Sequence, residues 1–236
     1  MKTRALGTQN TILPEKGLAH EEILSLMSNA VEKENVIWEK GHLSGSVYHG
    51  QHEHQNFLTK CFAHYSLSNP LHPDIWPSVM KFESEIISMT AHLVDGGVSS
   101  ICGCTTSGGT ESIILAIKAH RDYYRDNYHI QEPELICTVS AHAAVDKACD
   151  LMNIKLIKVD IDPMTCKIDL HAVKRALSAN TILIYASAPS YPHGAIDPVK
   201  ELSQIAVKYG VGLHVDCCLG GFVLPFAKKA GFSIPG

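Results

Sequence analysis

Two patterns of hydrophobic and polar positions divide the chain near residue 100. Before it, apolar residues recur at three- and four-residue spacing, which predicts helices over 20–40, about 56–65 and 78–94. After it, short apolar runs typical of buried strands alternate with helical stretches. The expected strands are 100–104, 134–139, 154–159, 181–186 and 211–215, and the expected helices are 111–126, 142–151, 169–178 and 197–209.

The second pattern predicts an α/β fold. Strands that alternate with helices form a mixed, mostly parallel sheet with helices on both faces, and ligands bind at the carboxyl ends of such strands. The segment 66–77, SLSNPLHPDIWP, contains three prolines and excludes regular structure there. We therefore expect an N-terminal helical and loop segment over 1–77 and a large α/β domain over 78–236.

Composition argues against a nucleic-acid-binding protein and against a membrane-spanning one. The 236 residues carry 20 Lys and Arg against 24 Asp and Glu, a net charge of −4, so a surface that follows nucleic-acid phosphates is not expected. No run approaches the ~20 apolar residues of a membrane span, and the N-terminus lacks the apolar core of a signal peptide. A cytoplasmic protein is the expectation.

Cysteine and histidine usage does not favour a metal site. The eight cysteines include no CxxC pair, and we expect reduced, mostly buried thiols. His49, His52 and His54 lie close together in sequence, but no Cys or carboxylate has suitable ligand spacing, so a solvated loop is favoured.

The segment 104–112, CTTSGGTES, leads directly into an expected helix. Its central residues Ser107, Gly108, Gly109 and Thr110 can supply hydroxyl groups and free backbone N–H groups at a helix N-terminus, where the dipole favours a phosphate. A plain loop-to-helix turn that binds nothing explains this segment equally well when it is considered alone.

Two further side chains follow expected strands. His142 lies between two alanines, so its ring is free to stack on a flat ligand, although a helix-capping or core histidine is the alternative. Asp216 ends a strand, where a carboxylate either pairs with a pyridinium nitrogen or caps the next turn. A phosphate cradle, an imidazole and a strand-end carboxylate together are what a pyridoxal phosphate site needs.

Longer motifs give this set a family context. The chain is similar to the pyridoxal-phosphate group II decarboxylase superfamily, and within it to the sphingosine-1-phosphate lyases, from about residue 12 to its end. The segments that carry the resemblance are LSGSVY (43–48), SNPLHPDIWP (68–77), SAHAA (140–144), YPHGAIDP (191–198) and HVDCCLGGF (214–222). It implies a fold type I large domain, pyridoxal phosphate as cofactor and a homodimer.

The resemblance also implies roles for particular residues. The cofactor residues it implies are Ser107, Gly108, Gly109 and Thr110 for the phosphate, His142 for ring stacking, Asp216 for the ring nitrogen, and Ser187 nearby. Tyr48, Asn69 and His72 would face substrate, partly across the dimer interface, although the last two also suit plain turns. The implied reaction cleaves the C2–C3 bond of a sphingoid long-chain base phosphate, giving a long-chain aldehyde and phosphoethanolamine.

One component of the family pattern is missing from this sequence. The Schiff-base lysine would follow Asp216 by several tens of residues in a Ser-Ala-Asp-x-His-Lys type segment, and Lys228 and Lys229 lie too close to that aspartate. We therefore expect a large domain that is incomplete at its C-terminus and a chain that is inactive alone.

Three interpretations of this sequence stay open. They are a lyase for long-chain base phosphates, a group II amino-acid decarboxylase, and a non-catalytic truncated form. A longer eukaryotic form would lie at the cytosolic face of the endoplasmic reticulum membrane.

Overall fold

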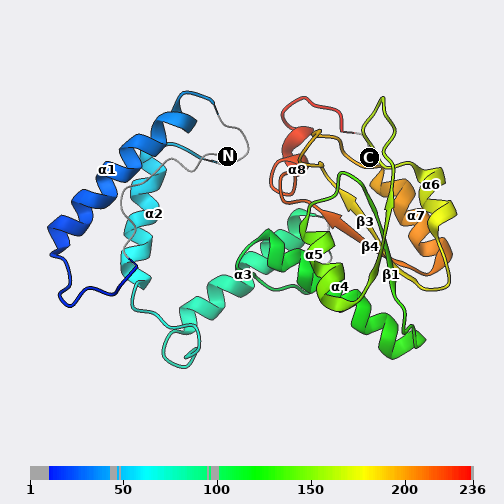
Figure 1. Cartoon of the computed structure of the whole chain (residues 1–236), viewed down its shortest axis with the longest axis horizontal. Coiled ribbons are helices and arrows are strands. Elements are labelled where there is room, and N and C mark those ends of the chain that lie inside the picture. Colours follow the sequence, from blue (N-terminus) through cyan, green and yellow to red (C-terminus); the bar gives the residue numbers. More distant parts are fainter. Residues whose placement is uncertain (1–10, 43–46, 48, 95, 97–100, 235–236) are drawn as a thin grey trace. The chain divides into compact units, whose positions relative to one another are not determined.

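The computed structural model describes residues 11–42, 47, 49–94, 96 and 101–234. The chain divides into two compact units, Met1–Ser68 and Asn69–Gly236. Figure 1 gives the positions of the helices and strands along the chain. No helix in the described ranges is long and apolar enough to cross a membrane.

The described residues before position 100 form three helices, as the sequence predicts. They are α1 (His20–Glu39), α2 (His52–Tyr65) and α3 (Pro77–Leu93), and α3 begins at a proline whose missing N–H is harmless at that position. None of the three contains a buried residue. Many of their apolar side chains, Leu24, Phe62 and Met89 among them, are instead exposed.

A four-stranded parallel sheet forms the centre of the second unit. Its strands are arranged in the order β2-β1-β3-β4. Their bounds confirm four of the five expected strands: β1 (Glu134–Thr138), β2 (Lys155–Val159), β3 (Thr181–Ser187) and β4 (Gly212–Asp216).

The fifth expected strand, 100–104, is wrong over its described part, 101–104, which has no strand structure. A strand exists only where a neighbouring strand takes up its backbone hydrogen bonds, and none of the described segments pairs with these residues.

Helices cover both faces of the sheet (Figure 1), as expected. α4 (Gly109–Tyr128) and α5 (Ala144–Met152) pack on one face, and α6 (Leu170–Ala176) and α7 (Val199–Tyr209) on the other. The short helix α8 (Leu224–Ala227) follows β4 and is not predicted by the sequence pattern.

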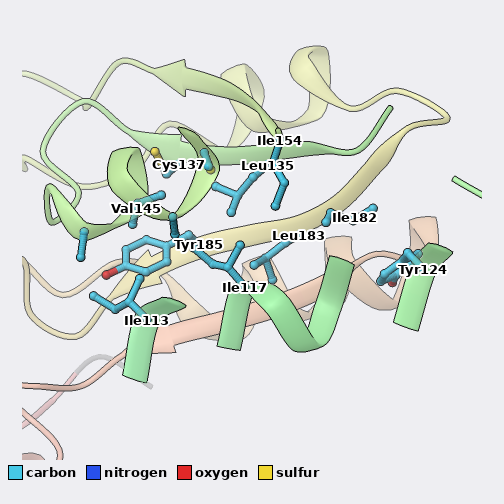
Figure 2. Packing of buried hydrophobic residues seen from close by; sticks show 13 residues of the cluster. Ile113, Ile117, Tyr124, Leu135, Cys137, Val145, Ile154, Ile182, Leu183 and Tyr185 are labelled. Carbon is cyan, nitrogen blue, oxygen red and sulfur yellow. The ribbon is translucent and has the colours of Figure 1, made fainter. Parts of the chain in front are cut away.

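Alternate residues of the central strands build the two halves of the core. Leu135 and Cys137 of β1 point toward α4 and α5, whereas Ile136 between them packs with α6 and α7. In Figure 2 Ile113 and Ile117 of α4 lie against β3. Each fully buried aliphatic side chain of this kind contributes about 1.5–3 kcal/mol to stability.

A hydrogen bond near the C-terminal end of α4 shows in which direction this helix runs relative to the sheet. The Tyr124 hydroxyl donates a hydrogen bond of 2.8 Å to the carbonyl oxygen of Gly210, just before β4 begins. The last turns of α4 thus lie at the amino ends of the strands. Its first residues, at Gly109, therefore lie at the carboxyl edge of the sheet.

The strand order also shows where the connections from neighbouring strands run in opposite directions, which is the point at which open α/β sheets bind ligands. α5 leads from β1 outward to β2 on one face, and α7 leads from β3 outward to β4 on the opposite face. The connections from the two central strands thus diverge, and ligands of such sheets bind outside the carboxyl ends at that point.

The prediction of mostly buried thiols is wrong. Cys137 and Cys149 are buried in the sheet core and Cys166 is half-buried, but Cys61, Cys102, Cys104, Cys217 and Cys218 are exposed, and all eight are free. The exposed thiols lie in α2 or in loops. The apolar segments that contain them are not covered by other parts of the described chain.

Candidate functional site

Three of the predicted site residues follow the carboxyl ends of neighbouring strands. His142 lies just after β1, Ser187 ends β3, and Asp216 ends β4. Ser187 and Asp216 are direct partners in the pairing of β3 with β4. The parallel sheet thus brings to one edge three residues that are far apart in the sequence.

The predicted phosphate residues form the start of α4. Gly108 is the N-cap, Gly109 and Thr110 open the helix, and their N–H groups have no acceptor within it. Ser107 donates its backbone N–H to Glu111 Oε2 at 2.6 Å. Hydrogen bonds from the side chain and backbone of Ser107 lower the pKa of the Glu111 carboxyl.

Hydroxyl groups hold the loop before this helix in place. Thr105 Oγ1 donates to Glu83 Oε1 of α3 at 2.5 Å. Thr106 Oγ1 lies 2.7 Å from Ser112 Oγ in the first turn of α4. The loop is therefore tied both to the preceding helix and to the helix that it opens.

Glycines at the start of α4 and in the turn after Asp216 allow neighbouring segments of the chain to approach closely. A Cβ at Gly109 would lie 3.8 Å from Cys218 Sγ, so the start of α4 is next to the turn that follows Asp216. In that turn, a Cβ at Gly220 would lie 2.1 Å from the carbonyl oxygen of Ala188, a distance that no side chain can occupy. The structure thus brings the expected phosphate cradle and the expected carboxylate together.

His142 is exposed, and one edge of its ring is already used. Its Nδ1 accepts a hydrogen bond of 3.0 Å from the backbone N–H of Ala144 at the start of α5. The capping interpretation is therefore correct for this edge, and it assigns the proton of the neutral ring to Nε2. Capping through an edge leaves the ring faces available for stacking.

Both oxygens of Asp216 accept hydrogen bonds. Oδ1 accepts the backbone N–H of Cys218 at 2.9 Å, as expected for a strand-end aspartate that caps a turn. Oδ2 accepts the hydroxyl of Tyr185 on β3. Our sequence analysis missed Tyr185, although a tyrosine two residues before Ser187 must share its side of the sheet.

A second missed residue holds the end of β3. The buried carboxylate of Asp197 accepts the backbone N–H of Ser187 at 2.8 Å and that of Ile168 at 2.8 Å. Burial raises the pKa of the Asp197 carboxyl, although these two hydrogen bonds oppose the shift. It is the one carboxylate in the segment YPHGAIDP, which is a signal that could have identified it.

Two of the expected substrate residues, Asn69 and His72, do not join this group. Tyr48 lies outside the described residues. Asn69 and His72 are exposed and form a local turn, in which Asn69 Oδ1 accepts the N–H of Leu71 at 3.0 Å. Within the described ranges no hydrogen bond connects either residue to the carboxyl edge of the sheet.

Other side chains with possible roles are exposed as well. Lys228 and Lys229 are at the end of α8 and after it, with both side chains in solvent. Among the residues that the structure describes, no three His, Cys, Asp or Glu side chains group as metal ligands would.

The arrangement at the carboxyl edge fits pyridoxal phosphate. The first turn of the long helix α4 offers N–H groups to a phosphate, and the ring of His142 has open faces. Each oxygen of Asp216 accepts one hydrogen bond and keeps a further lone pair for a ring N–H. The site thus offers a partner for the phosphate of the cofactor, for the face of its ring and for its ring nitrogen.

Comparisons with known proteins point to the same cofactor. A family model described as the pyridoxal-dependent decarboxylase conserved domain matches residues 8–235. The chain is 47% identical over 232 residues to the sphingosine-1-phosphate lyase of Arabidopsis thaliana and 44% identical over 223 residues to that of Dictyostelium discoideum. These alignments cover 95% and 94% of the chain, but 42% of each relative.

A solved structure gives the same picture of the fold. The sphingosine-1-phosphate lyase of Burkholderia pseudomallei K96243 matches with a TM-score of 0.90 at 38% identity, over 95% of this chain and 53% of that chain. The expected fold type I architecture and the expected cofactor, pyridoxal phosphate, are confirmed by these matches. With its strand-end residues in place and a family model that spans nearly its whole length, the chain belongs to the pyridoxal-dependent decarboxylase family.

Proposed function

We propose that this chain forms the cofactor-binding part of a lyase that cleaves long-chain base phosphates between C2 and C3. The observation that carries the proposal is the convergence of the α4 N-terminus, His142 and Asp216 at one edge of the sheet. The reaction is supported by the 44% and 47% identity to relatives named sphingosine-1-phosphate lyase. The products would be a long-chain aldehyde and phosphoethanolamine.

The residues of the chain have distinct tasks in this proposal. The Ser107 hydroxyl and the backbone N–H groups of Gly108 to Thr110 bind the cofactor phosphate, and the His142 ring holds the cofactor plane. Asp216 accepts a hydrogen bond from the N–H of the protonated ring nitrogen. Ser187 lies beside Asp216 and faces the same edge. When bound, pyridoxal phosphate supplies a protonated ring that accepts the electrons of the breaking bond.

Substrate contacts and assembly extend the proposal to the N-terminal part. Tyr48, Asn69 and His72 are assigned to the substrate phosphate, for which a hydroxyl, an amide and an imidazole are suitable partners. A homodimer is supported by the apolar side chains of α1, α2 and α3, which the chain itself leaves exposed. The proposed location is the cytoplasm.

Cofactor binding and substrate choice are tested separately. For the chain, we expect His142→Ala and Asp216→Asn each to weaken pyridoxal phosphate binding at least about tenfold in calorimetry, because each removes one of three ligand contacts. The control Asp162→Asn, in an exposed turn after β2, which is the edge strand opposite β4, should bind as the unaltered chain does. Equal affinities in all four proteins would refute the site.

Substrate choice is measured on the protein purified from its source. The assay follows the long-chain aldehyde released from sphingosine 1-phosphate by mass spectrometry and, in parallel, carbon dioxide released from amino acids. Aldehyde release supports the lyase. Carbon dioxide release alone would make the protein an amino-acid decarboxylase. The absence of both products would indicate a non-catalytic form.

A further inference from the structure

We propose that Tyr185 is a positioning residue, which fixes the carboxylate of Asp216 for the ring nitrogen of the bound cofactor. The inference rests on the proposed role of Asp216 and adds to it a residue from the neighbouring strand. The direct observation is the hydrogen bond from the Tyr185 hydroxyl to Asp216 Oδ2.

The sheet register makes this contact possible. Tyr185 pairs with His214 and Ser187 pairs with Asp216, so the tyrosine lies one pleat before the site on the adjacent strand. Its side chain is long enough to reach the end of β4 from there. Together with the Cys218 N–H on Oδ1 at 2.9 Å, the hydroxyl holds the carboxylate at both oxygens, which fixes the plane of the group.

The tyrosine itself has little freedom to move. It is 1% exposed, and its ring lies close to Ile113 of α4 in Figure 2. On its own sheet face it also stacks on the imidazole of His214, with ring centroids 5.4 Å apart and planes 29° from parallel. Burial raises the pKa of Tyr185, so the phenol stays a neutral donor. A rigid donor of this kind can orient a flexible carboxylate.

Orientation matters because the bond expected at Asp216 is charge-assisted. An N–H on a protonated ring and a carboxylate form a short, directional hydrogen bond that weakens steeply when the angle is poor. A carboxylate held only at Oδ1 can rotate out of the plane of the cofactor ring. Removal of the Tyr185 hydroxyl should therefore reduce affinity only for ligands that carry a ring N–H.

This selectivity defines the experiment. The probe is pyridoxine 5′-phosphate, which has the phosphate and the ring nitrogen but no aldehyde to react with exposed lysines. The comparison ligand is its benzene analogue, in which CH replaces the ring nitrogen. Calorimetry on the chain should give about tenfold weaker probe binding for Tyr185→Phe, with an unchanged affinity for the benzene analogue.

Tyr124→Phe is the matched control. It removes another buried tyrosine hydroxyl from the same core cluster, but that hydroxyl donates to Gly210 at the opposite end of the sheet. Thermal unfolding of both variants measures any general loss of stability. We expect Tyr124→Phe to bind both ligands as the unaltered chain does, so a drop in both variants would indicate a structural effect and overturn the proposal.

The ultraviolet spectrum of the bound probe adds a readout that a purely structural role would not change. A 3-hydroxypyridine absorbs differently when its ring nitrogen is protonated. Tyr185→Phe should shift the bound probe toward the unprotonated form at a fixed pH, and Tyr124→Phe should not. An unchanged spectrum together with unchanged selectivity would overturn the proposal.

Asp216→Asn separates this proposal from the proposed site. If Asp216→Asn lowers affinity for the probe selectively but Tyr185→Phe does not, the site stands and the role of Tyr185 is refuted. If Asp216→Asn does not discriminate between the two ligands, Asp216 does not meet the ring nitrogen and the site assignment itself fails. The double variant should be no weaker than Asp216→Asn alone, because the two residues act as a unit.

Discussion

Substitution of Asp197 by alanine tests how the end of β3 is held. The carboxylate accepts two backbone N–H groups, from Ser187 and Ile168, each at 2.8 Å. Both donors belong to buried residues, which are 5% and 3% exposed, so water cannot easily replace the lost acceptor. A buried N–H left without an acceptor costs about 1–3 kcal/mol, which gives a loss of about 2–6 kcal/mol for Asp197→Ala.

That loss is large beside the stability of a typical domain, about 5–15 kcal/mol. The measurement is urea unfolding followed by far-ultraviolet circular dichroism at pH 7. Asp162→Ala is the control, since Asp162 also accepts two backbone N–H groups, at 2.9 and 2.8 Å, but is exposed. Water can take over there, and the expected loss is below about 1 kcal/mol. Equal losses in the two variants would refute the reasoning.

The same substitution gives a pH dependence with a defined sign. Burial raises the pKa of Asp197 above its ordinary value of 3.8, so between the two values the folded chain binds more protons than the unfolded chain. The free energy of unfolding contributed by this group is fully present below pH 3.8 and falls as pH rises through the raised pKa. The stability difference between the unaltered chain and Asp197→Ala should therefore shrink as pH increases, and a difference that grows would contradict the assignment.

Three further outcomes are expected. Gly220→Ala places a Cβ 2.1 Å from the carbonyl oxygen of Ala188 and so displaces the turn after Asp216, which should weaken pyridoxine 5′-phosphate binding several-fold in calorimetry. Cys137 and Cys149, whose pKa values burial raises to about 12, should react with a thiol reagent at pH 8 only after urea is added, whereas the exposed thiols react at once. Tyr124→Phe should lower the free energy of unfolding by about 0.5–1.5 kcal/mol in urea titrations.

The sequence predicted the sheet well because its central strands are buried on both faces. Every residue of β1 and of β3 is buried, so the middle of each strand appears as an apolar run. The run 101–104 is also apolar but forms no strand. Hydrophobicity indicates that a segment needs a partner, and it does not indicate whether the described chain supplies one.

The candidate site was predictable only in part. Residues at strand ends, such as His142 and Asp216, could be identified because parallel strands bring their carboxyl ends together whatever their exact register. The contact between Tyr185 and Asp216 depends on which residues of β3 and β4 face each other. That register is fixed by packing against α4 and α7, which no local pattern contains.

The last residues of β3 connect all of these features. Tyr185 holds the carboxylate of Asp216, and Ser187 is held by Asp197. The N–H of Ala188 donates to the carbonyl oxygen of Asp216 at 2.8 Å, and its own carbonyl oxygen excludes any side chain at Gly220. A small shift of this strand end would move the carboxylate and the turn beside α4 together. Substitutions that loosen β3 without touching a ligand should therefore weaken cofactor binding, and Asp197→Ala is the variant in which both effects are measured at once.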